Sequence, residues 1–139
     1  MPVFLLNDEL VFPDTAQAEP DGMLAIGGDL STERLILAYQ NGIFPWFSED
    51  DPIVWWSPNP RFVIEPHAIK ISKSMRSLLN KGTFRVSLNE DFEGVINNCK
   101  TVPREDQDGT WITQEMKNAY IELHKKGWAH SFEAWKDDQ

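Results

Sequence analysis

The chain has 139 residues, of which 41% are hydrophobic, and a formal net charge of −9 at pH 7. A chain of this length can bury roughly two-thirds of the surface that it exposes when unfolded, so we expect a globular protein. It contains no apolar stretch approaching the roughly 20 residues of a membrane-spanning helix, and its first residues lack the basic start of a secretion signal. These features exclude an integral membrane protein and predict a cytoplasmic one.

The positive charges gather in one segment. The acidic total argues against a protein that coats nucleic acid, because phosphate binding depends on lysine and arginine. At physiological salt, however, charges beyond roughly 8 Å are screened from that segment. Its basic residues are Arg61, Lys70, Lys73, Arg76, Lys81 and Arg85. The pattern fits a local phosphate-binding surface or a solvated helix face, and charge alone leaves both open.

Residues 1–61 predict a small, loop-rich domain with one regular helix. Ser31 is placed to cap a helix that runs to about Gln40, and Gly42 is placed to end it. A stretch containing Pro and Gly precedes this helix, and prolines interrupt the aromatic run that follows it. The prolines are Pro45, Pro52, Pro58 and Pro60.

Beyond residue 61 the pattern alternates between strand and helix. We expect an extended segment over 62–64, a helix over 73–80 closed by Gly82, and a half-buried strand over 83–88. The change of pattern predicts a second domain over 62–139. The chain as a whole is therefore predicted to be α+β.

Two further helices and a last strand are expected. Asn89 is placed to cap a helix whose apolar face includes Cys99, which predicts a buried, unreactive thiol. After a polar loop over 101–108, Thr113 is placed to start a helix. A strand over 129–135 then leads into a charged turn with no partner after it, which suggests a part of a longer protein.

Motifs for catalysis or cofactor binding are mostly missing. Gly27 and Gly28 precede Asp29 without the spacing of a dinucleotide-binding or phosphate-binding loop. The three histidines share no metal-ligand spacing and the chain has a single cysteine, so no metal site is predicted. Nothing in the sequence indicates a hydrolase.

Tryptophan is unusually frequent in this chain, which has six tryptophans and only two tyrosines. The six are Trp46, Trp55, Trp56, Trp111, Trp128 and Trp135. The first four lie in expected loops, where aromatic rings can stack on bases and contribute roughly 1–3 kcal/mol for each base. The alternative is that the rings fill the core of a small domain, which is the commoner role for any single tryptophan. We expect at least one of them to face a ligand.

Five blocks resemble the signature segments of leucyl/phenylalanyl-tRNA–protein transferases. They are residues 27–31 (GGDLS), 39–47 (YQNGIFPWF), 55–61 (WWSPNPR), 109–113 (GTWIT) and 120–135 (YIELHKKGWAHSFEAW). Long blocks in the right order over nearly the whole chain are more specific than any single short motif. The resemblance implies a small N-terminal domain, 1–61, and then a domain like the acetyltransferase (GNAT) fold, 62–139, that is incomplete at its C-terminus.

The resemblance also implies an activity. Such enzymes move leucine, phenylalanine or, less well, methionine from aminoacyl-tRNA to proteins that begin with Arg or Lys, and so mark these proteins for degradation by the N-degron pathway. They need no metal, cofactor or membrane. Roughly another hundred residues would follow, a length that completes an ordinary domain. They would carry a GESMFS-like block, most of the amino-acid pocket and the catalytic Asp and Gln, so we assign no catalytic residue here and expect this chain alone to be inactive.

The matching blocks imply which residues bind the tRNA. Trp46 and Trp111 resemble the residues that hold its 3′-terminal adenosine. Tyr39 and Tyr120 are expected beside them, although both also lie on apolar helical stripes, where packing is the simpler explanation. The basic segment would contact the tRNA backbone without reading sequence. Its predicted contacts are Lys70, Lys73, Arg76, Lys81 and Arg85.

The sequence leaves two other functional classes to consider. A non-catalytic module that binds the tRNA 3′ end or a peptide would share the aromatic and basic features. An acetyl-CoA-dependent transferase on the GNAT fold is disfavoured, because the pyrophosphate-binding segment Arg/Gln-x-x-Gly-x-Gly/Ala does not occur in the sequence.

Overall fold

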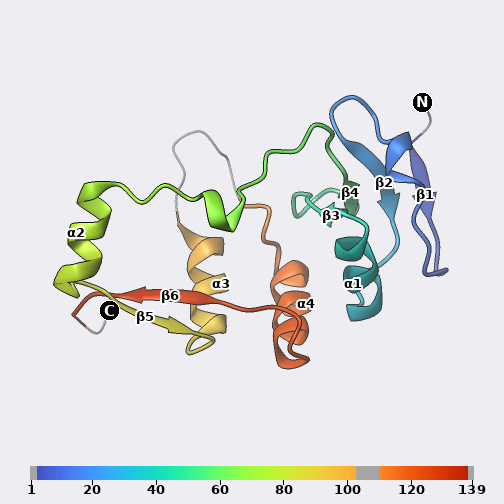
Figure 1. Ribbon diagram of the computed structural model, residues 1–139. Helices are drawn as coiled ribbons and strands as arrows, with labels where there is room; N and C mark the ends of the chain where they lie inside the picture. Colours follow the sequence, from blue (N-terminus) through green and yellow to red (C-terminus); the bar gives the residue numbers. More distant parts are fainter. Residues whose placement is uncertain (1–2, 103–109, 138–139) are drawn as a thin grey trace.

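The structure is a computed structural model that describes residues 3–102 and 110–137. Its mixture of helices and short strands confirms the predicted α+β class (Figure 1). In chain order the elements are β1 (Phe4–Leu6), η1 (Thr15–Gln17), β2 (Met23–Gly27), α1 (Thr32–Gln40), β3 (Phe44–Pro45), β4 (Val54–Trp56), η2 (Pro66–Ala68), α2 (Lys73–Lys81), β5 (Arg85–Leu88), α3 (Phe92–Thr101), α4 (Gln114–Lys125) and β6 (Phe132–Trp135). No helix in the described ranges has the length and apolar character needed to cross a membrane.

The N-terminal part is built on a four-stranded sheet in the order β1-β2-β4-β3. β1 runs parallel to β2, whereas β4 runs antiparallel to both β2 and β3. The sequence predicts loops where β2 and β4 lie. That prediction is wrong, because strands of three to five residues are too short for an alternating pattern to show.

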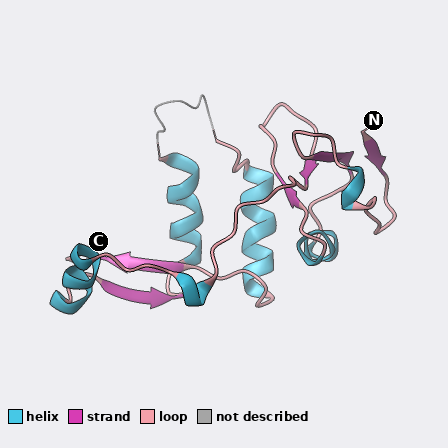
Figure 2. Cartoon of the chain, turned by 45° about the horizontal axis from the view of Figure 1, so that its top comes forward, coloured by secondary structure: helices cyan, strands magenta, loops and turns pink. Residues whose placement is uncertain are grey.

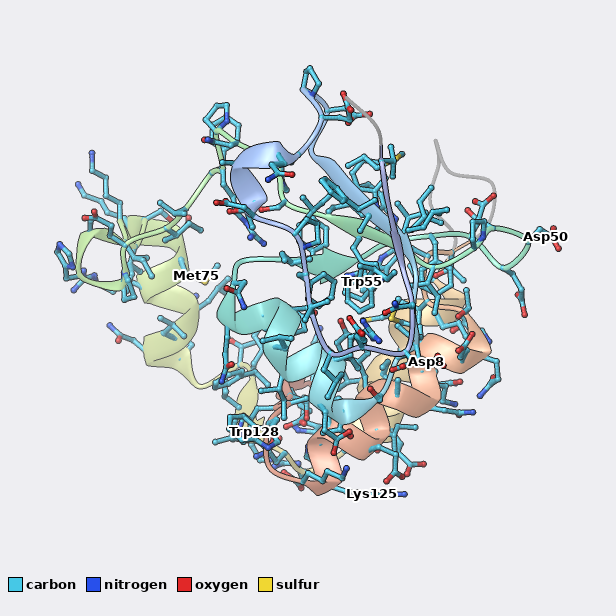
Figure 3. The ribbon with its side chains drawn as sticks, turned by 90° about the vertical axis from the view of Figure 1, so that its right-hand side faces the viewer. Asp8, Asp50, Trp55, Met75, Lys125 and Trp128 are labelled. Atoms are coloured by element: carbon cyan, nitrogen blue, oxygen red, sulfur yellow. The ribbon has the colours of Figure 1, made fainter. Side chains whose placement is uncertain are left out.

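The largest buried core joins this sheet to helices α1 and α4. Trp55 of β4 is completely buried at its centre, where its indole Nε1 donates to the Gly27 carbonyl at 2.9 Å. Figure 3 shows Trp55 enclosed by the surrounding elements. The core members are Leu24, Ala25, Leu30, Leu35, Ala38, Ile43, Phe47, Trp55, Met116 and Leu123. Helix α4 thus packs on the N-terminal sheet, although the sequence predicts that it belongs to the second domain.

Three predicted helix starts are confirmed by their caps. The Ser31 hydroxyl accepts from the Arg34 amide at 3.3 Å, and the Thr113 hydroxyl accepts from the Met116 amide at 3.1 Å. Ser72 caps α2 in the same way. Each cap satisfies an amide that the first turn of a helix leaves unpaired.

Two predictions around α3 are wrong. Asn89 does not cap the helix: its φ of 59° places it in a left-handed turn, and its side chain bonds the Ser131 amide and the His130 ring. Asp91 is the cap instead, accepting from the Gly94 amide. Cys99 is exposed rather than buried, although Phe92, two turns earlier on the same face of α3, is buried. The predicted loop over 101–108 lies largely outside the described residues.

Helix α2 and strands β5 and β6 form an extended arm. β5 and β6 pair antiparallel, with Arg85 opposite Trp135 and Leu88 opposite Phe132. Figures 1 and 2 both show α2 beside this pair, at the opposite end of the molecule from β1. Residues 61–86 are all exposed, and 62–64 form no strand. The expected half-burial of the strand over 83–88 is therefore wrong, because its apolar residues Phe84, Val86 and Leu88 are 45%, 65% and 55% exposed.

Candidate functional site

An aromatic pocket of about 370 Å³ opens where α1, β3 and α4 meet. It contains all four side chains that the resemblance implies for adenosine binding. Its lining residues are Tyr39, Phe44, Pro45, Trp46, Arg61, Trp111 and Tyr120. Phe44, Pro45 and Arg61 were not predicted, although each lies in a block that carries the resemblance.

Backbone pairing holds Trp46 at the pocket. It directly follows β3, and its amide donates to the Val54 carbonyl at 3.0 Å. Its own carbonyl accepts from the Trp56 indole at 2.7 Å, and the two rings lie 6.2 Å apart. Trp46 nevertheless remains 48% exposed. Its backbone is therefore fixed by the sheet while about half of the residue stays open to a ligand.

Trp111 reaches the pocket from the segment just before α4. The Ile112 amide donates to the Thr110 hydroxyl at 3.2 Å, and Thr113 caps the helix that follows. Ile112 itself is buried, and Trp111 is half-buried. The helix cap and the buried neighbour therefore fix the backbone that carries the Trp111 ring. This segment is far along the sequence from the one that carries Trp46.

Tyr39 and Tyr120 meet at the pocket through their hydroxyl groups, which are hydrogen-bonded to each other. Their rings lie edge to face at 6.4 Å between centroids. Burial raises the pKa of Tyr39 above 10.0, although the Tyr120 hydrogen bond and the Arg61 charge act in the opposite direction. Burial, followed by the nearness of Tyr39, also raises the pKa of Tyr120. Both hydroxyls therefore stay neutral at physiological pH, where they can donate and accept hydrogen bonds.

The described lining of the aromatic pocket contains no carboxylate and no imidazole. It offers flat rings, two neutral hydroxyls and one guanidinium. Such a surface can stack on a planar ring and orient a polar group, but it supplies no strong proton acceptor at neutral pH. The pocket is therefore equipped for binding and orientation. No cluster of metal-binding side chains occurs in the described part of the chain.

A larger cavity of about 520 Å³ adjoins the aromatic pocket and shares Tyr39 and Tyr120 with it. It is lined largely by apolar side chains from α1, α3 and α4, with Trp128 and His130 at the segment that follows α4. Trp128 is 61% exposed and lies at the edge of the molecule in Figure 3. The sequence gives no signal for this cavity, because its lining residues are scattered along the chain.

The predicted backbone contacts lie elsewhere, on the arm. Lys73 and Lys81 are the first and last residues of α2, and Lys70 precedes that helix. Arg85 differs from the others, because it forms an ion pair with Glu90 at 2.6 Å and covers the Trp135 ring. All five predicted residues, Lys70, Lys73, Arg76, Lys81 and Arg85, are exposed. The structure thus keeps the basic surface separate from the aromatic pocket.

Comparison with known proteins identifies relatives of this chain. A family model described as leucyl/phenylalanyl-tRNA protein transferase matches residues 63–139, and the model of that family's N-terminal domain matches residues 28–59. Curated proteins named leucyl/phenylalanyl-tRNA–protein transferase are similar over almost the whole chain. The protein from Anaeromyxobacter sp. strain K is 55% identical over 138 residues, which are 99% of this chain and 59% of the relative.

Two other relatives with the same name give similar values. The Flavobacterium johnsoniae protein is 53% identical over 136 residues, or 98% of this chain and 64% of the relative. The Hydrogenovibrio crunogenus protein is 52% identical over 140 residues, or 99% of this chain and 55% of the relative. The chain therefore spans between 55% and 64% of the length of these three relatives.

Proposed function

The chain belongs to the leucyl/phenylalanyl-tRNA protein transferase family, and we propose that it takes part in moving an amino acid from aminoacyl-tRNA to the N-terminus of a protein. The donors are Leu, Phe and, less well, Met, and the acceptors begin with Arg or Lys and are thereby marked for degradation. The reaction takes place in the cytoplasm and uses no cofactor. A GNAT-like domain from residue 62 onward would follow the N-terminal domain.

The convergence of four aromatic side chains on one pocket is the observation that carries this proposal. Tyr39 and Tyr120 are 81 positions apart in the sequence, yet their hydroxyls are hydrogen-bonded. Trp46 and Trp111 come from separate segments and line the same pocket of about 370 Å³. Two indoles with neutral hydroxyls beside them suit an adenosine, which has a flat base and a hydroxyl-bearing sugar.

The chemistry of transfer asks mainly for orientation. The ester that links the amino acid to the terminal ribose is already activated, and positioning alone can supply roughly 7–11 kcal/mol of a barrier. The attacking α-amino group has an ordinary pKa of about 7.7–8.0, so only part of its deprotonation needs assistance. In this proposal the aromatic pocket holds the adenosine end of the ester, and a group outside the pocket's described lining accepts the proton.

The basic residues of the arm would serve the rest of the tRNA. They are exposed, and lysine and arginine contacts to phosphates would orient the acceptor stem without recognising its sequence. The proposed contacts are Lys70, Lys73, Arg76, Lys81 and Arg85. Binding through such contacts depends on salt, because each neutralised phosphate releases counterions.

Transfer of labelled leucine from leucyl-tRNA to a peptide beginning with Arg tests this function. The assay is run with this chain and with the full-length Anaeromyxobacter relative, and a peptide beginning with Asp serves as the negative control. We expect transfer by the relative, and binding of a non-hydrolysable leucyl-adenosine by this chain. Binding without transfer by either protein would favour the alternative, a non-catalytic module for RNA ends. Absence of both activities would contradict the proposal.

A further inference from the structure

Arg61 is the one charged side chain among the described residues that line the aromatic pocket. Its guanidinium carbon lies 5.0 Å from the centre of the Phe44 ring, and its Nη1 donates to the Gly42 carbonyl at 2.9 Å. Gly42 lies between α1 and β3, and Phe44 is the first residue of β3 and itself lines the pocket. These two contacts hold the guanidinium at the rim.

Most of the donors on this guanidinium have no partner in the part of the chain that the structure describes. Within residues 3–102 and 110–137, no carboxylate forms an ion pair with Arg61, and its side chain donates to the Gly42 carbonyl alone. A guanidinium carries five N–H donors, so a ligand can still bind in the bidentate manner. Its positive charge also reaches into the pocket, where it favours the ionised form of Tyr39. Among the described residues, therefore, no carboxylate offsets the positive charge that the rim presents to a ligand in the pocket.

A phosphate fits this position. In an RNA strand, the terminal adenosine is joined through its 5′ carbon to the phosphate of the preceding link, so that phosphate lies next to the nucleoside. Arginine matches phosphate because its planar fork can donate two parallel hydrogen bonds. Arg61 also borders a second cavity of about 330 Å³, to which Thr15, Ser57 and Asn59 contribute neutral polar side chains. That cavity offers room for the strand to continue past the guanidinium.

We infer that Arg61 binds the phosphate that joins the terminal adenosine to the nucleotide before it. Arg61 thereby makes the aromatic pocket selective for the end of a nucleic-acid strand over free adenosine. The inference rests on the proposed function, because it requires adenosine in the pocket. It gives Arg61 a role apart from the basic residues of the arm, which would bind phosphates at a distance from the reacting end.

Calorimetric titration of the 139-residue chain with two ligands tests the inference. One ligand is adenosine, and the other is adenosine 5′-(methyl phosphate), which carries one negative charge as a phosphodiester does. We expect the phosphate-bearing ligand to bind about tenfold more tightly at low salt, as for a hydrogen bond to a charged group. This preference should shrink as salt is raised.

Three variants test whether Arg61 causes the preference for the phosphate-bearing ligand. Arg61→Gln, whose amide can still donate to the Gly42 carbonyl, should lose the preference and keep its affinity for adenosine. Arg61→Lys retains the charge and should keep part of the preference. Lys136→Gln removes an exposed cation at the far end of the arm and should keep all of it.

The outcomes separate the two proposals. Equal affinity for both ligands, or a preference that survives in Arg61→Gln, would overturn the role of Arg61 and leave the adenosine pocket standing. If neither ligand binds, both the inference and the proposed function fail. Inorganic phosphate tests whether Arg61 binds a free anion instead of a strand phosphate. If it binds to the chain as tightly as adenosine 5′-(methyl phosphate) does, Arg61 is a site for free anions, and the inference is wrong.

Discussion

The two ends of the molecule differ in how their side chains are held. The N-terminal sheet with α1 and α4 encloses a core in which Trp55 and Leu35 are fully buried. The arm formed by α2, β5 and β6 leaves residues 61–86 exposed throughout. Figure 2 shows the N-terminal sheet and helix α2 at opposite ends of the molecule, with α3 and α4 between them. The aromatic pocket therefore adjoins a packed core, whereas the basic residues lie on exposed elements of the arm.

A matched pair of leucine substitutions gives the largest expected effect. Leu35 on α1 is fully buried, whereas Leu79 on α2 is 57% exposed. Leu35→Ala should lower the free energy of unfolding by about 2–5 kcal/mol, because it leaves a cavity in the core. Leu79→Ala should lower it by less than about 1 kcal/mol. Urea unfolding followed by circular dichroism measures both, and equal losses would contradict the difference between the ends.

Glu133 on β6 is a buried residue of the arm and can be used to test how the arm is stabilised. Its carboxylate is buried and accepts hydrogen bonds from the Ser131 and Ser87 hydroxyls, each at 2.5 Å. These bonds lower the pKa of Glu133 from 4.5 to about 2. A pKa lower in the folded than in the unfolded state stabilises the fold above pH 4.5, and this stabilisation is lost as the pH falls toward 2.

Glu133→Gln should therefore lower the melting temperature at pH 7, and the gap to the parent chain should close between about pH 4.5 and pH 2. Glu49→Gln, in an exposed loop, is the control and should show no such convergence. A gap that stays constant down to pH 2 would show that the Glu133 hydrogen bonds do not depend on its charge.

A smaller effect is expected from single basic residues of the arm. Arg76→Gln should leave stability unchanged and reduce the slope of log affinity against log salt by about 0.7–0.9 for an acceptor-stem RNA. Lys125→Gln at the end of α4 serves as the control, because Lys125 is paired with Glu122. An identical slope for the parent chain and Arg76→Gln would show that Arg76 contacts no phosphate.

Part of this structure follows from local sequence signals. The cap at Ser31 and the helix starts near Lys73 and Thr113 are confirmed, because a hydroxyl just before each helix fixes its start by accepting a hydrogen bond from the first turn. The family resemblance read from five blocks is also confirmed by the family models. Both signals are encoded in consecutive residues, so one sequence is sufficient to find them.

Features that depend on distant partners could not be read in this way. The strands β1, β2 and β4 are ordered by pairing across the sheet rather than by their own pattern. Asn89 has a typical capping side chain, but its contacts with His130 and Ser131 keep it in a left-handed turn. Arg61 enters the aromatic pocket only because the chain between α1 and β3 folds against it.

The central claim is that Trp46 and Trp111 hold the adenosine end of an aminoacyl-tRNA. The most direct measurement is the affinity of this chain for a non-hydrolysable leucyl-adenosine, compared with Trp46→Ala, Trp111→Ala and the exposed control Trp128→Ala. Losing a stacked base should weaken binding about tenfold or more in the first two variants, with the control close to the parent chain. Unchanged affinity in Trp46→Ala and Trp111→Ala, with folding intact by circular dichroism, would contradict the claim and return both rings to a packing role.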